Sequence, residues 1–201
     1  MNFQTTASFI LASQSPRRRE LFAQLHVPFD VESADVEETS VAFQTASQYV
    51  QDVALLKAQA VAAKHPDAVV IGSDTIVVYH DQLLHKPKTT NEAVQHLQKL
   101  RGKTHEVLTA VAIVTAQNTY SFVETTSVTF RMVSDAFIEA YVATGDPFDK
   151  AGGYGIQTDG VFFVEKIDGD YLTVVGLPLS RLTDELLQHN LLQLETQEVQ
   201  A

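Results

Sequence analysis

The sequence predicts an α/β fold in which helices flank one mixed central sheet. Segments with helical periodicity alternate with segments rich in Val and Ile, which is typical of this class. At least two pairs of β segments are joined by tight turns, so the sheet is expected to contain antiparallel neighbours. No stretch rich in Pro, Gly or Ser divides the 201 residues. We therefore expect a single domain, in one or two lobes, with a core over about 8–192.

The chain is predicted to open with a strand, a turn and a helix. The apolar run at 8–12 predicts a buried strand. Ser15 is placed to cap the following helix, and Pro16 suits its first position. A second helix is predicted over about 47–64, where apolar residues recur at helical spacing.

The middle of the chain is predicted to form a strand, a hairpin and a helix. Residues 68–79 are rich in Val and Ile, and we expect Gly72-Ser73-Asp74 to interrupt this strand. Leu83-Leu84 is expected to return as the second strand of a hairpin. A Thr89–Glu92 capping box then predicts a helix that ends near Leu100.

The next segments are predicted to be two long strands and a helix. The strands cover about 106–116 and 120–133 and are joined by Gln117-Asn118. Ser134 is expected to cap a helix that Gly145 ends.

The C-terminal part is predicted to begin with a glycine-rich loop over 145–157. Asp168-Gly169 predicts a hairpin between strands at 161–167 and 171–175. A last helix is expected from Pro178 to Leu187 or as far as Leu192, and the polar residues 195–201 are expected to fray.

Composition excludes some chemistry and favours a small anionic ligand. The chain has no cysteine, so disulfides, zinc–thiolate sites and cysteine nucleophiles are excluded. The formal net charge of −11 disfavours nucleic acid as a partner, although Arg17-Arg18-Arg19 forms a local basic run. The N-terminus lacks the pattern of a signal peptide, and no apolar run approaches the ~20 residues of a membrane span. We expect a cytoplasmic protein that binds neither membrane nor nucleic acid.

The arginine run suggests a phosphate site at the start of a helix. Positive side chains in a first helical turn oppose the helix dipole unless an anion binds there. Arginine also matches the geometry of phosphate oxygens. The alternative interpretation of Ser13 to Glu20 is a solvated basic turn.

Three residues elsewhere could contribute to a metal or anion site. Asp74 lies among Val and Ile, where an uncompensated carboxylate is costly, so it could face a cleft and hold Mg²⁺ or orient water. Its alternative is a local turn. Lys57 lies on the apolar stripe of its helix, where a snorkelling lysine is the alternative to an anion ligand. Glu38 could complete a metal site with Asp74, or lie in a solvated acidic turn.

The glycine-rich loop and the segment near Lys86 carry the remaining candidates. Asp149 and Lys150 offer an acid and a cation, and the Gln157 amide could recognise the edge of a base. Lys86 could equally belong to a solvated loop. The seven histidines lack the spacing of a zinc site, so none is expected.

The order of these motifs resembles the Maf family. The resemblance rests on Ser-Gln-Ser-Pro-Arg-Arg at 13–18, Ser-Asp-Thr-Ile-Val at 73–77, Lys-Pro at 86–87, Asp-Pro-Phe-Asp-Lys-Ala-Gly-Gly-Tyr-Gly-Ile-Gln at 146–157 and Val-Val-Gly-Leu-Pro-Leu at 174–179. It extends from about Phe9 to Leu187. It implies a fold like that of inosine triphosphate pyrophosphatases, with a cleft between two lobes. It also implies hydrolysis of a nucleoside triphosphate to the monophosphate and pyrophosphate, with Mg²⁺ or Mn²⁺, in an enzyme that is often a homodimer.

The resemblance also assigns roles to residues. It places the proposed catalytic base on Asp74, which with Glu38 lies on the metal side. Arg17, Thr75 and Gln157 match the subgroup similar to dTTP and UTP pyrophosphatases. The implied substrate-binding residues are Ser13, Arg17, Arg18, Lys57, Thr75, Lys86, Asp149, Lys150 and Gln157.

The sequence departs from the family pattern at Gly153, Asp170 and Thr173, where alanine, serine and asparagine are common. The carboxylate of Asp170 puts the fine substrate preference in question. A second hypothesis is a nucleotide-binding regulator of cell division or septum formation that does not need hydrolysis. A third, nucleic-acid binding through Arg17 to Arg19, lacks interleaved aromatic residues.

Overall fold

The computed structural model describes residues 2–195, apart from the side chain of Thr39. A seven-stranded mixed sheet runs through its centre in the order β3-β2-β4-β6-β7-β8, with β5 also paired to β4. β2 is parallel to β3 and β4, and the other pairs are antiparallel. The strands of this sheet are β2 (Phe9–Ala12), β3 (Phe29–Val31), β4 (Val69–Tyr79), β5 (Gln82–Leu84), β6 (Thr104–Val114), β7 (Thr119–Phe130) and β8 (Val164–Asp168).

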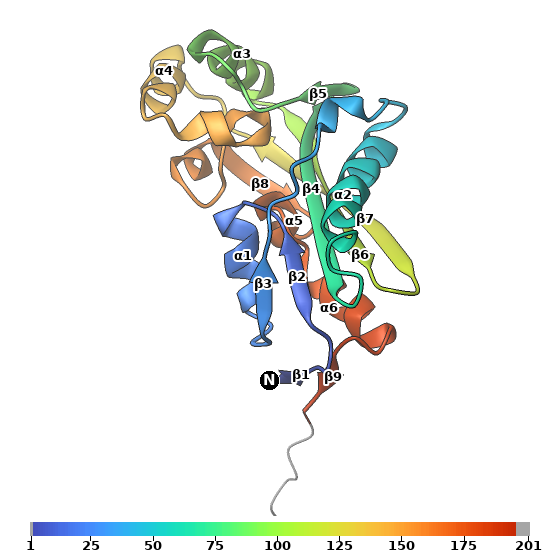
Figure 1. Cartoon of the computed structure of the whole chain (residues 1–201). Coiled ribbons are helices and arrows are strands. Elements are labelled where there is room, and N and C mark those ends of the chain that lie inside the picture. The colour runs from blue at the N-terminus through green and yellow to red at the C-terminus, as the bar shows by residue number, and fades with distance from the viewer. Residues whose placement is uncertain (1, 196–201) are drawn as a thin grey trace, which may run out of the picture.

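Helices cover both faces of this sheet (Figure 1). They are α1 (Pro16–Ala23), α2 (Ala46–Ala62), α3 (Thr90–Leu100), α4 (Asp135–Ala143), α5 (Tyr171–Val175) and α6 (Leu179–Gln188). Short 3₁₀ helices lie at Glu38–Ser40 (η1), Asp146–Asp149 (η2), Ala151–Gly153 (η3) and Asp159–Phe163 (η4). A small antiparallel pair, β1 (Phe3–Gln4) and β9 (Gln193–Leu194), brings the two ends of the described chain together.

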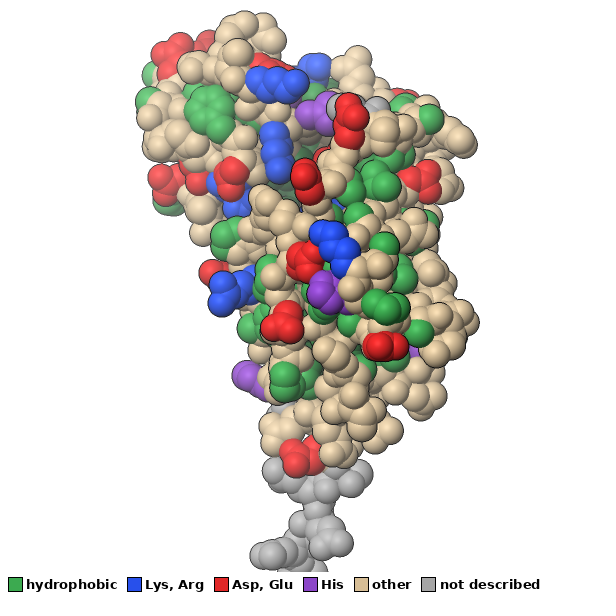
Figure 2. All heavy atoms as spheres, in the orientation of Figure 1, with side chains coloured by type: hydrophobic (Ala, Val, Ile, Leu, Met, Phe, Trp, Pro, Cys, Tyr) green, Lys and Arg blue, Asp and Glu red, His purple; other side chains and the backbone are tan. Residues whose placement is uncertain are grey.

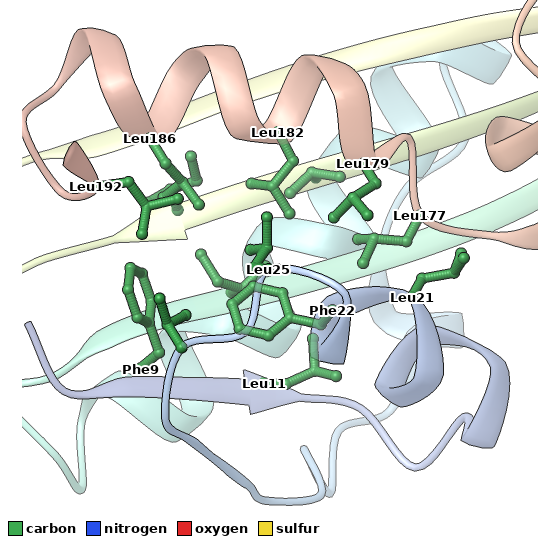
Figure 3. Close-up of a cluster of buried hydrophobic side chains, with 14 of the residues drawn as sticks. Phe9, Leu11, Leu21, Phe22, Leu25, Leu177, Leu179, Leu182, Leu186 and Leu192 are labelled. Carbon is green, nitrogen blue, oxygen red and sulfur yellow. The ribbon is translucent and has the colours of Figure 1, made fainter. Parts of the chain in front are cut away.

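Three apolar clusters fix the layers, because alternate residues of each strand face opposite sides of the sheet. On one face α2 packs through Val50, Val53 and Ala54. The other face holds two clusters at opposite ends of the long strands. One joins α1 and α6 to the sheet, and Figure 3 shows Leu182 and Leu186 of α6 pointing toward Phe9, Phe22 and Leu25. The second joins α3 and α4 around Phe130 and Phe163.

The local signals of helix ends were predicted correctly. Ser15 caps α1 with Pro16 next to it, and the Ser15 side chain accepts from the Arg18 backbone N–H. Thr89 caps α3 and Ser134 caps α4 in the same way. Gly145 follows α4 in a left-handed conformation, with φ of 82°. The β4–β5 hairpin and the β6–β7 pair are also confirmed.

Two predictions about strands were wrong. β4 is continuous through Gly72, Ser73 and Asp74, because β6 pairs with every residue from Val70 to Val78. No hairpin forms at Asp168-Gly169, because Asp170 is the N-cap of a helix. Its carboxylate accepts the backbone N–H groups of Leu172 and Thr173, so 171–175 is α5 rather than a strand.

Smaller differences lie at segment ends. The predicted loop at 145–157 contains η2 and η3, and residues 161–163 belong to η4 rather than a strand. The last helix ends at Gln188, one residue beyond Leu187, the earlier of its two predicted ends. The predicted fraying concerns a tail of which 196–201 lie outside the described residues. Within the described part, none of the helices has the length and apolarity needed to cross a membrane.

Candidate active site

The candidate site is a cleft at a gap in the sheet. β2 pairs with β4 only as far as Ala12 opposite Gly72, and β5 pairs with β4 only from Val77 onward. Between these two partners the edge of β4 from Ser73 to Ile76 has no strand beside it among the described residues. Asp74 and Thr75, whose side chains leave opposite faces of the strand, both reach the cleft through this gap. The predicted interruption therefore lies in the neighbours of β4 and not in β4 itself.

Every residue predicted for the site lines this one cavity, whose volume is about 420 Å³. The residues come from segments far apart in the chain: the β2–α1 turn, α1, η1, α2, β4, the segment after β5, and the 149–157 loop. They are Ser13, Arg17, Arg18, Glu38, Lys57, Asp74, Thr75, Lys86, Asp149, Lys150 and Gln157. Arg19, which follows Arg18, and His85, which precedes Lys86, do not line the cavity.

Lys57 holds two carboxylates together. Its Nζ lies 2.7 Å from Asp74 Oδ1 and 2.7 Å from Glu38 Oε1. Only 12% of the Lys57 side chain and 11% of the Asp74 side chain are exposed, whereas 49% of Glu38 is exposed. Burial disfavours the charged form of Glu38, but the hydrogen bond and charge of Lys57 outweigh it and lower the pKa of this carboxyl. Lys57 is thus an ion-pair partner, rather than a snorkelling surface lysine.

Arg18 is half-buried and lies against neutral oxygen atoms. Its Nε donates to the Gly176 carbonyl at 2.8 Å and its Nη2 donates to Thr75 Oγ1 at 2.9 Å. Burial lowers the pKa of Arg18, and the charge of Asp74 partly offsets this. Nη1 has no hydrogen-bond partner among the residues whose side chains are described. Arg18 therefore brings an unneutralised cation to the cleft wall.

Asp149 joins two cations that line the cleft. Its Oδ2 lies 3.2 Å from Arg17 Nη1, and its Oδ1 accepts from Lys150 Nζ at 2.6 Å. Lys150 Nζ also donates to the carbonyl and to Oδ1 of Asp146, so all three of its N–H groups have acceptors. Burial disfavours the charged form of Asp149, but Lys150, followed by Arg17, lowers its pKa overall. Arg17 and Lys150 are already paired before any ligand binds.

The other predicted residues have fewer interactions. Lys86 and Gln157 are exposed, and Lys86 forms no ion pair with a described residue. Ser13 is buried at the end of β2, and its hydroxyl accepts from the Ser15 backbone N–H at 3.2 Å. These three side chains can turn toward a ligand without breaking an ion pair.

Two acidic side chains of the cleft converge on one lysine. The described residues contain no group of three or more His, Asp or Glu side chains placed to hold a metal by themselves. Asp74 and Glu38 nevertheless contact the same Lys57 Nζ, so their carboxylates converge. Mg²⁺ is commonly bound by one or two carboxylates together with substrate phosphates and water.

The cleft is positive within an acidic protein. Five basic and three acidic side chains line it, whereas the whole chain has a formal net charge of −11. On the face shown in Figure 2, Lys and Arg side chains lie next to Asp and Glu rather than in a separate basic patch. Such a site favours a small anion.

Sequence reasoning missed several residues that support the site. Asp146 accepts from Lys150, from the Tyr141 hydroxyl and from Thr158 Oγ1, both of the latter at 2.6 Å. Its position beside Pro147 at the start of η2 gave no sign of these contacts. Thr109, on β6 opposite Thr75, lies in a run whose composition predicts a strand and no further role.

His105 and Tyr154 form a buried pair behind the cleft. His105 Nε2 lies 2.7 Å from the Tyr154 hydroxyl, and Tyr154 lines the cavity. Burial lowers the pKa of His105 to about 3. The ring is therefore neutral at physiological pH, and its position suits a packing role.

Among solved structures, the chain is similar to the Ham1 protein of Staphylococcus aureus, with 18% identity and a TM-score of 0.46 over 61% of this chain and 71% of that chain. It is also similar to a nucleoside-triphosphatase, described as a dITP/XTP pyrophosphatase, from Mycobacterium abscessus. That match has 16% identity and a TM-score of 0.40 over 63% of this chain and 75% of the other.

Sequence relatives are much more similar. A dTTP/UTP pyrophosphatase of Bacillus cytotoxicus is 51% identical over 180 residues, which cover 90% of this chain and 94% of the relative. A protein of the same name from Bacillus cereus is 50% identical over 182 residues, covering 90% and 95%. The family model described as Maf-like protein matches residues 8–189. This chain belongs to the family of Maf-like proteins.

Proposed function

We propose that this chain hydrolyses dTTP and UTP to the nucleoside monophosphate and pyrophosphate. One observation carries the proposal: eleven side chains from widely separated segments converge on one positive cleft of a size usual for small-molecule sites. The relatives named dTTP/UTP pyrophosphatase, at about half identity over most of the chain, support the choice of substrate.

In the proposed reaction, cations bind the triphosphate and a carboxylate activates water. Arg18 offers N–H groups to phosphate oxygens, and Lys86 adds a second cation. Asp74 takes a proton from the water that attacks phosphorus, while Lys57, 2.7 Å away, holds its carboxylate in place. Positive side chains then stabilise the charge that develops on the leaving pyrophosphate.

We also propose that Asp74 and Glu38 hold a divalent cation, Mg²⁺ or Mn²⁺, together with the substrate. Such an ion neutralises phosphate charge and lowers the pKa of bound water. Gln157, exposed at the cleft, is proposed to contact the base, and Thr75 and Arg17 complete the substrate site.

We further propose a single domain, a homodimer, a cytoplasmic location and no nucleic-acid partner. The family resemblance is the basis for the homodimer, and the formal net charge of −11 disfavours nucleic acid. The three apolar clusters share one sheet, which supports the single domain. Sedimentation velocity tests the homodimer, and filter retention of labelled DNA tests the absence of nucleic-acid binding.

The test is pyrophosphate release from dTTP, UTP, CTP, GTP and 7-methyl-GTP with Mg²⁺ or Mn²⁺. We expect rapid release from dTTP and UTP and a loss of at least about a hundredfold in Asp74→Asn, as is usual for removal of a general base. Asp168→Asn, which changes an exposed carboxylate on β8, is the matched control and should keep wild-type turnover.

Other outcomes would overturn separate parts of the proposal. Wild-type turnover in Asp74→Asn would refute the role of Asp74, and preference for 7-methyl-GTP would refute the substrate assignment. Binding of nucleotides by the wild type without any release would favour a regulator that does not need hydrolysis.

A further inference from the structure

We propose that Thr109 is a positioning residue that fixes Arg18 through the hydroxyl of Thr75. This inference rests on the proposed function, because it concerns the same phosphate-binding cleft. Thr109 does not line the cavity and is fully buried, so it is not expected to touch the substrate.

The hydrogen bonds among these residues have only one possible direction. Thr109 Oγ1 donates its single hydrogen to the Thr173 carbonyl, 2.7 Å away, because a carbonyl can only accept. Thr109 Oγ1 must therefore accept in its contact with Thr75 Oγ1, which is 2.9 Å long. The Thr75 hydrogen is used in this bond, and a Thr75 lone pair faces Arg18 Nη2 at 2.9 Å.

The register of the sheet makes this arrangement possible. Thr75 of β4 and Thr109 of β6 are directly opposite each other in the antiparallel pair. Both side chains lie on the face that carries the two separate apolar clusters, between those clusters. A chain of polar groups thus runs across this face of the sheet from α5 to α1, between the two apolar clusters.

The end of α5 provides a second anchor for the same guanidinium. The Gly176 carbonyl accepts from Arg18 Nε at 2.8 Å and from the buried Ser73 hydroxyl at 3.1 Å. The two anchors hold two different nitrogens, which fixes the plane of the guanidinium as well as its position.

Neutral anchors leave the charge of Arg18 available. No carboxylate forms an ion pair with Arg18 among the described residues, in contrast to Arg17, Lys57 and Lys150. A hydroxyl and a carbonyl orient the side chain without neutralising it. Removing the Thr109 hydroxyl would free the Thr75 hydroxyl to rotate away and would loosen Arg18.

The experiment measures binding of inorganic triphosphate by calorimetry and, separately, pyrophosphate release from dTTP. Thr109→Val keeps the shape of the side chain but breaks the chain of hydrogen bonds. We expect it to weaken triphosphate binding and raise KM for dTTP by roughly tenfold, the effect of losing about one buried hydrogen bond. Thr109→Ser keeps a hydroxyl that can donate and accept the same hydrogen bonds. Its triphosphate affinity and its KM for dTTP should therefore stay within about twofold of wild type.

Two controls separate positioning from general destabilisation. Thr126→Val removes another buried strand threonine, whose hydroxyl donates to the Asp170 carbonyl and makes no hydrogen bond to Thr109, Thr75 or Arg18. It should leave triphosphate binding unchanged. In an Arg18→Lys background, Thr109→Val should have little further effect, because residues that act as one unit are not additive.

Wild-type triphosphate affinity in Thr109→Val, an equal loss in Thr109→Ser, or full additivity with Arg18→Lys would overturn the inference. If Thr109→Val does not fold, Thr75→Val interrupts the chain one step nearer Arg18 and should give the same loss. Failure of the proposed function is distinguishable from failure of this inference. If the wild type releases no pyrophosphate, its affinity for inorganic triphosphate can still be compared with that of Thr109→Val, and the inference still predicts a roughly tenfold difference.

Discussion

Replacing Lys57 by methionine should destabilise the protein mainly because it leaves Asp74 without its counter-ion. The two charged atoms lie 2.7 Å apart with little exposure on either side. At that distance the gross attraction is about 6 kcal/mol for an effective dielectric constant of about 20. Desolvation of both groups offsets most of this, so the net contribution of the pair is small. Removal of one partner is costly, by about 3 kcal/mol, because the other charge stays buried and unpaired.

The assay is urea unfolding of Lys57→Met, Asp74→Asn and the double variant at neutral pH. Asp74→Asn should cost less than Lys57→Met, because Glu38 still accepts from the lysine. The double variant should be more stable than the sum of the single changes implies, by about 2 kcal/mol, because it contains no orphaned carboxylate at 74. Lys64→Met, which removes an exposed partner of Glu32, is the matched control and should keep the wild-type urea midpoint. Additivity of the two single changes to within about 0.5 kcal/mol would refute the reasoning.

The remaining predictions concern packing and pH. Gly72→Ala should lower the free energy of unfolding by about 2 kcal/mol in urea titrations, because its Cβ would lie 2.8 Å from Ala58 Cβ where α2 crosses β4; an unchanged midpoint would show that α2 can move aside. The native state holds His105 neutral with a pKa of about 3, against an ordinary value of 6.5, so its contribution to stability is complete above pH 6.5 and falls as pH decreases toward 3. Between pH 7 and pH 5 the wild type should lose about 2 kcal/mol more stability than His105→Gln, and equal losses would contradict burial of the neutral ring.

Features set by a few neighbouring residues were predictable from the sequence. The caps at Ser15, Thr89 and Ser134 depend on hydrogen bonds across three residues, so their patterns identify the helix starts. The Asp168-Gly169 hairpin failed for a local reason as well. Asp170 competes for the same segment, and three hydrogen bonds from 172–173 to its carboxylate favour the helix.

Features set by pairing between distant segments were not predictable. The gap beside β4 depends on where β2 ends and where β5 begins. The residue types at 73–76 predict neither of these positions. The partners of Lys57 show the same limit. Its place on an apolar stripe by itself favoured a snorkelling side chain over an anion ligand, and only the fold brings two carboxylates to it. The list of site residues could be predicted only because the order of motifs along the chain resembles that of a known family.

The cations of the cleft differ in how readily a triphosphate can use them. Arg17 and Lys150 share Asp149, so a phosphate that binds either one competes with this carboxylate. Lys150 has no N–H group left over, and its contact with a phosphate requires the loss of a hydrogen bond to Asp146 or Asp149. Arg18 is held by neutral oxygens and can bind at once. Lys86, which forms no ion pair with a described residue, is equally available. We expect the triphosphate to contact Arg18 and Lys86 first, and Arg17 and Lys150 to follow as Asp149 moves or pairs with a cation that arrives with the substrate.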